Sequence, residues 1–234
     1  MKESRTQLRV LGVFASLAAL VGCADDTAGK AEAGSVQVVI SGEDIATDGI
    51  SFPTGSEVTV VDGWELSLSH VLVTISDVEL SKNPDKSPAD QSQRDSVVAR
   101  AQGPWAVDLH APGSVPGAGG GDRAVPLTLI ANQNEAGGEP FASDERYAFG
   151  FAVSAATYDA TIVNFEGDEQ TEAAYAEMVE KGATVMYIGS AKFKGKDCSS
   201  SDGTYDFSQI PDEVPFRFAF RTPTQYVNCQ NEQN

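Results

Sequence analysis

Apolar and polar residues alternate with a period of two along much of the chain, which predicts β-strands. Val36, Val38 and Ile40 mark a first strand. The alternation is regular over 147–153, and again where Phe216, Phe218 and Phe220 alternate with arginine and alanine in a strand expected to bury its phenylalanines. Shorter apolar runs predict further strands at 97–101, 105–109, 126–131, 161–165 and 184–193.

The densest pattern lies around a central tryptophan. The β-branched run 58–61 reaches Asp62-Gly63, a dipeptide typical of a two-residue hairpin turn, and Trp64 opens the return strand. Along that strand the apolar residues change parity near His70 and again near Ser76. Such changes predict β-bulges or bends at these two points, as in strands that pass from one sheet of a sandwich to another.

One segment has a helical pattern instead. Asp168 is a suitable N-cap, acidic residues fill the first turn, and Lys181-Gly182 is a suitable end. The polar stretch 83–94 and the Gly/Pro-rich stretch 111–122 predict surface loops, as does the stretch from 41 to 55. Many short strands with one short amphipathic helix predict an all-β fold, an antiparallel β-sandwich of the immunoglobulin or transthyretin type.

The N-terminus has a different composition from the rest. Three basic residues in the first nine precede an uncharged apolar run of twelve residues, 10–21, and Leu20-Val21-Gly22-Cys23 follows. The run is too short to span a bilayer, for which about 20 residues are needed. Charge, apolar length and the small residue before Cys23 resemble the signal peptide and lipobox of bacterial lipoproteins.

That resemblance implies removal of residues 1–22 and acylation of Cys23, including by palmitate, so that the acyl chains anchor the mature protein to a membrane. Residues 23–34, small and polar, are expected to be a flexible tether, and 35–234 a single folded domain. Ala24 follows the cysteine, a pattern that in lipoproteins of enteric type permits transport to the outer membrane. We therefore expect an envelope location, the outer membrane rather than the inner, facing the periplasm or the cell surface.

The mature chain is strongly acidic. The signal carries three of the 16 basic and one of the 34 acidic residues, which leaves 13 against 33 and a net charge of minus 20. Nucleic acid is therefore not an expected partner, because its phosphates would be repelled. An acidic surface fits an exported domain whose partners are other envelope proteins.

Besides Cys23, the chain has only Cys198 and Cys229. An even pair in an oxidising compartment favours a disulfide, which would close a loop of about 31 residues and contribute roughly 3 to 4 kcal/mol. A metal thiolate pair or a redox couple would need closer spacing, such as Cys-x-x-Cys.

The stretches DGWELSLSHVLVTISDVEL and GPWAVDL resemble a broad set of uncharacterised exported lipoproteins of Gram-negative bacteria. This resemblance spans about 35–165 and implies a transthyretin-like or immunoglobulin-like sandwich, without any catalytic residue. The body is also similar to periplasmic copper-binding lipoproteins of the methanobactin-associated type, which share an all-β exported domain with an aromatic-rich closing strand.

Candidate metal ligands are few. Copper would require His70 and His110, the only histidines, while Met178 and Met186 lie on or near the expected helix. Calcium would require oxygen ligands from acidic loops, Asp197, Asp202 and Asp206 or Glu166, Asp168 and Glu169, although neither set has EF-hand spacing.

Catalytic motifs such as Gly-x-Ser-x-Gly and His-Glu-x-x-His do not occur in the sequence. The leading hypothesis is a membrane-anchored lipoprotein that acts as a binding or structural module and not as an enzyme. A metal-binding lipoprotein, using copper or calcium, is the alternative. A hydrolase would need carboxylates, or a serine and a histidine, that converge only in the fold.

Overall fold

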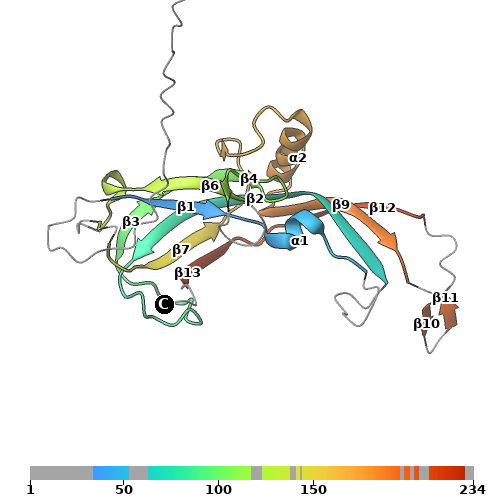
Figure 1. Ribbon diagram of the computed structural model, residues 1–234, viewed down its shortest axis with the longest axis horizontal. Helices are drawn as coiled ribbons and strands as arrows, with labels where there is room; N and C mark the ends of the chain where they lie inside the picture. Colours follow the sequence, from blue (N-terminus) through green and yellow to red (C-terminus); the bar gives the residue numbers. More distant parts are fainter. Residues whose placement is uncertain are drawn as a thin grey trace, which may run out of the picture. The chain divides into compact units, whose positions relative to one another are not determined.

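The computed structural model describes residues 34–52, 63–116, 123–137, 141–142, 144–195, 198–200, 203–205 and 211–229, which lie in one compact unit. The expected signal peptide, the tether up to residue 33, the run 58–61 and Asp62 lie outside the described residues. Strands dominate, and the fold is an all-β sandwich, as the alternation predicts (Figure 1).

The described strands form three sheets. The largest contains β2 (Trp64–Ser81), β3 (Val97–Ala101), β4 (Trp105–Asp108), β7 (Ala148–Val153), β8 (Thr161–Ile162), β9 (Val185–Phe193), β12 (Val214–Phe220) and β13 (Thr224–Cys229). The second contains β1 (Val36–Ile40), β5 (Val115–Pro116) and β6 (Arg123–Ile130). The third is a hairpin of β10 (Cys198–Ser200) and β11 (Gly203–Tyr205), and a short 3-10 helix, η1, covers Asn132–Asn134. β5, β10, β11 and β13 were not predicted.

The central strand is β2. Along one edge it pairs with β9 and then with β7, and along the other with β4 and β3. The register shifts between Leu68 and His70 and again between Ser76 and Glu79, where Asp77 has a φ of 48°. Both predicted bulges are therefore confirmed, and the second lies within the pairing with β7, just after the partner along that edge has changed from β9 to β7 between Val73 and Ile75.

Two layers cover the middle of β2. On one face, the sheet of β1 and β6 packs over Val73, Ile75 and Val78. On the other face, α2 (Glu169–Glu180) packs over Leu72. Because both faces are covered, every residue from 71 to 76 is buried, which accounts for the continuous apolar stretch in the sequence.

Helix α2 confirms the predicted helix. A carboxylate oxygen of Asp168 accepts hydrogen bonds from the backbone nitrogens of Gln170, at 3.1 Å, and Thr171, at 3.4 Å, so the side chain caps the first turn. Gly182, with a φ of 58°, follows the helix end. The helix buries Met178, among others, against the sheet.

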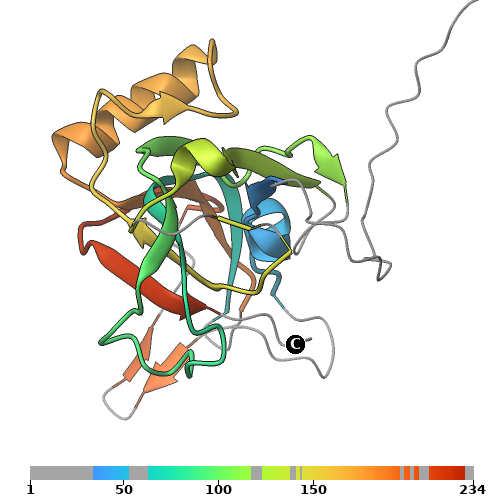
Figure 2. The ribbon, with the colours of Figure 1, turned by 90° about the vertical axis from the view of Figure 1, so that its left-hand side faces the viewer.

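A second helix, α1 (Glu43–Asp48), occupies part of the stretch predicted as a loop. Six residues are too few for a helical period to appear in a sequence, so tertiary packing decides this element. Ala46 is buried, and Gly49, with a φ of 74°, lies so close to β2 that a Cβ there would come within 2.1 Å of the carbonyl oxygen of Leu66. Figures 1 and 2 show α1 and α2 on opposite sides of β2.

Candidate apolar binding site

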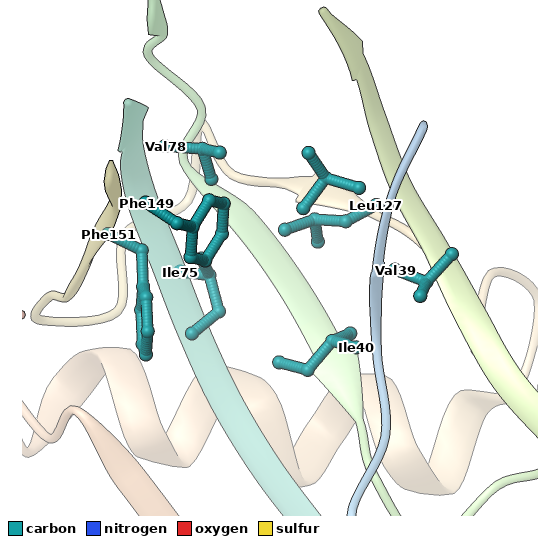
Figure 3. A pocket seen from close by; sticks show the side chains of 8 residues that line it. Val39, Ile40, Ile75, Val78, Leu127, Phe149 and Phe151 are labelled. Carbon is teal, nitrogen blue, oxygen red and sulfur yellow. The ribbon is translucent and has the colours of Figure 1, made fainter. Parts of the chain in front are cut away.

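A half-open apolar pocket lies between the two large sheets, and we call it the inter-sheet pocket. Its volume is about 80 Å³. Its lining comes from β1, β2, β6 and β7 and consists of Val38, Val39, Ile40, Ile75, Val78, Leu127, Phe149 and Phe151. Figure 3 shows the side chains of Ile40, Ile75, Leu127 and Phe149 around the central space.

Two irregularities in the strands shape this pocket. The register of β1 against β6 shifts between Val38 and Val39, and Pro126, which has no N–H to donate, lies opposite Val39. All three of these consecutive residues, Val38, Val39 and Ile40, contribute to the lining, and Figure 3 shows the Ile40 side chain on the pocket side of β1 and that of Val39 on the other side. On β2, the bulge at 76–79 places the side chains of Ile75 and Val78 on the same face, whereas a regular strand would point them to opposite faces.

Two aromatic rings on β7 form one wall of the pocket. Phe149 and Phe151 are half-buried, and their centroids are 5.9 Å apart. The outer ring is held in place, because Phe151 stacks on Tyr226 of β13 with centroids 4.9 Å apart. The pocket therefore has a floor of buried aliphatic side chains and a wall of positioned aromatic rings.

The lining determines which ligands fit. Every lining side chain is a hydrocarbon, so the pocket offers no side-chain donor or acceptor, and a polar group inside it would lose its hydrogen bonds to water. Its volume is about half that of an engineered apolar cavity of ~150 Å³ that stays dry and binds benzene. A short alkyl segment or the end of an acyl chain matches this size and chemistry.

A second apolar depression lies along β12, and we call it the β12 groove. Its volume is about 110 Å³, and its lining consists of Ile45, Ile50, Leu66, Leu68, Tyr187, Phe216 and Phe218. The expectation that this strand buries its phenylalanines is wrong, because Phe218 and Phe220 are each 54% exposed. The sheet of β1 and β6 covers only the later part of β2. Over the earlier part, the groove is bounded by Ile45 of α1 and by Ile50.

The side chain of His70 takes part in a buried hydrogen-bond network centred on Asp108. Its Nδ1 lies 2.8 Å from a carboxylate oxygen of Asp108, whose side chain is only 3% exposed. Since a carboxylate only accepts hydrogen bonds, Nδ1 is the donor. The other Asp108 oxygen accepts from the backbone nitrogens of Val71, at 2.9 Å, and His110, at 3.0 Å. This network ties β2, β4 and the following loop together.

The two histidine side chains bind different elements. His110 donates from Nδ1 to the carbonyl oxygen of Ala46 in α1, at 2.8 Å, whereas His70 lies beside Thr171 of α2. Among the described residues, no three His, Cys, Asp or Glu side chains form a group that could hold a metal ion. The copper hypothesis therefore receives no support from the arrangement around His70 and His110.

The calcium hypothesis rested on two acidic sets. In one of them, Asp168 caps α2 and accepts a hydrogen bond from the Thr171 hydroxyl at 2.8 Å, while Glu166 and Glu169 are exposed. The hydrogen bonds from Thr171 hold the pKa of the Asp168 carboxyl below its usual value. Asp197, Asp202 and Asp206, which make up the other set, lie outside the described residues.

The predicted disulfide involves one described side chain. Cys229 is partly buried, and burial raises the pKa of its thiol above the usual value. Cys198 begins β10, but its side chain lies outside the description. Pairing of the two cysteines therefore stays a prediction.

The pocket residues did not emerge as a site from the sequence. The consecutive apolar residues Val38, Val39 and Ile40 were the available indication, since a one-sided strand would place a polar residue between them. The pairing of Phe151 with Tyr226, 75 positions further along, had no local indication.

Comparison with known proteins gives no assignment: no family model, no curated protein and no solved structure matches this chain. Within the described part of the chain, no helix has both the length and the apolar character needed to cross a membrane.

Proposed function

We propose that this chain is a lipid-anchored protein of the bacterial cell envelope that binds an apolar ligand in the inter-sheet pocket and acts as a binding module, not as a catalyst. The observation that carries the proposal is the half-open pocket lined entirely by hydrocarbon side chains. Such a pocket suits recognition of an alkyl or acyl group and offers no side chain for acid, base or nucleophilic chemistry.

The expected strength of binding follows from the pocket volume. Filling about 80 Å³ of apolar cavity is worth about 2 kcal/mol at ~24 cal/mol per Å³. That corresponds to roughly 30-fold in affinity. Any larger affinity would come from apolar contacts of the part of the ligand that lies outside the pocket.

Binding can be tested by filling the pocket. In the variant Ile40→Phe, a larger side chain should occupy the central space and weaken binding of decanol by roughly 30-fold. Displacement of Nile red fluorescence by decanol measures this affinity. Leu129→Phe is the matched control, because Leu129 lies on β6 but is 50% exposed and does not line the pocket. Equal affinities in Ile40→Phe and the unsubstituted protein would contradict the proposal.

The anchor is supported by the resemblance of residues 1–26 to lipoprotein signals and is tested separately. Two or more acyl chains, at about 0.8 kcal/mol per buried methylene, are enough for stable anchoring. Cys23→Ala should therefore abolish labelling by radioactive palmitate and leave uncleaved precursor. Membrane association that persists unchanged in this variant would show that Cys23 is not the anchor.

A further inference from the structure

Strand β12 has one free edge. It pairs antiparallel with β9 from Val214 to Phe220, and no other described strand pairs with it. The carbonyl oxygen of Phe220 faces β9, because it accepts the backbone N–H of Thr184 at 2.7 Å. Since backbone groups alternate in direction along a strand, those of Arg217 and Ala219 face the free edge. The backbone groups of Pro215 also face the free edge, where the lack of an N–H costs no hydrogen bond between strands.

The free edge also has an exposed apolar face. Phe216 and Phe218 stack with centroids 4.8 Å apart, and Phe220 packs edge-on against Tyr187. Phe218 and Phe220 remain more than half exposed. An unpaired strand with exposed large apolar side chains is a template for pairing with another strand, and natural proteins usually block such edges.

We propose that β12 pairs with β12 of a second copy of this chain, antiparallel and across a two-fold axis at Phe218. In this register Phe218 faces Phe218 of the second copy, and Phe216 faces Phe220. Arg217 faces Ala219, so the two backbones exchange hydrogen bonds there and no like charges lie directly opposite each other. The two sheets join edge to edge, and the exposed phenylalanines of both copies form one apolar cluster.

The charges at the ends of β12 favour the same register. Arg221 faces Pro215 of the second copy, and its diagonal neighbours there are Glu213, within reach of a long side chain, and Arg217, whose guanidinium already binds Glu177 of its own copy. Glu213 is half exposed and lies 3.5 Å from Lys192, while Arg221 has no ion-pair partner among the described residues. The axis therefore places two Arg221–Glu213 pairs across the interface. An axis at Arg217 would instead place two like charges opposite each other.

The register can be tested by cross-linking the full chain in its membrane. Because the backbone groups of Phe218 face β9, the two Phe218 residues form a non-hydrogen-bonded pair with a Cα separation of about 4.5 Å, which a disulfide can span. Phe218→Cys should give a covalent dimer under mild oxidation. Phe216→Cys is the matched control, because its two copies are offset by four residues, about 13 Å along the strand.

The proposal is supported if Phe218→Cys forms the covalent dimer efficiently and Phe216→Cys forms little. The unsubstituted chain gives the background of cross-linking through its own cysteines. Equal cross-linking of both variants would indicate random collision and would overturn it. So would the lack of any cross-link, which is also the result expected if β12 binds a different polypeptide.

Sedimentation of the detergent-solubilised full chain gives an independent measurement. Arg221→Glu should shift the protein towards monomer, because Glu213 of the second copy then has a like charge as its diagonal neighbour in place of its ion-pair partner. The double variant Glu213→Arg with Arg221→Glu should restore the dimer. Monomeric unsubstituted protein, or a double variant no more dimeric than Arg221→Glu, would contradict the proposed register.

Discussion

Truncation of Val78 tests both the packing of the core and the location of the binding site. Val78 is fully buried and lines the inter-sheet pocket. Val78→Ala removes two methyl groups, which costs about 1.6 kcal/mol in lost transfer free energy. An added cavity of roughly 40 Å³ costs about 1 kcal/mol more. The free energy of unfolding should therefore fall by about 2.5 kcal/mol.

Urea unfolding measures this loss as a midpoint shift of about 1.2 M, for an m-value of about 2 kcal/mol per M. The m-value itself should not change. Val98→Ala is the matched control, because Val98 is buried in the same core but does not line the pocket. Both variants should lose similar stability, and only Val78→Ala should bind decanol differently, with higher affinity for a larger pocket.

Two results would refute this reasoning. A loss of stability below about 0.5 kcal/mol would mean that the side chain is not packed as the structure shows. An equal change in decanol affinity in Val78→Ala and Val98→Ala would mean that general loosening of the core, and not pocket volume, governs binding.

Three further predictions concern the polar residues. The pKa of Asp168 is lowered, first by the hydrogen bond from the Thr171 hydroxyl. This carboxyl therefore stabilises the fold at pH values above its unfolded pKa, and the stabilisation is lost as the pH falls through its folded pKa. Acid unfolding followed by circular dichroism should show this loss of stability, and the variant Asp168→Asn should not show it. Asp108→Ala leaves three donors without their acceptor and should cost about 3 kcal/mol or more in chemical denaturation, so a cost near zero would contradict the network. Thiol counting in a denatured chain of residues 35–234, which leaves out Cys23, should find none if Cys198 and Cys229 are bridged, whereas two free thiols would rule out the bridge.

Local patterns predicted most of the regular structure. The alternation over 147–153 became β7, and the cap at Asp168 became the start of α2, because both depend on residues close in sequence. The parity changes near His70 and Ser76 located both bulges of β2, since a bulge shifts the side-chain period within one strand. The hydrogen bond between His70 and Asp108 joins residues 38 positions apart, and no local pattern predicted it.

The sequence by itself determined the strand periodicity, the bulges, the long helix, the acidic charge and the signal-like N-terminus, because each depends on the order of neighbouring residues. Only the tertiary structure decided which apolar faces are covered. Phe149 and Phe218 have the same alternating pattern in the sequence. Phe149 lines a pocket between two sheets, whereas Phe218 lies beyond the covering sheet and remains exposed. The difference arises because β1 and β6 extend over only part of β2, and their position is set by packing between residues far apart in the chain.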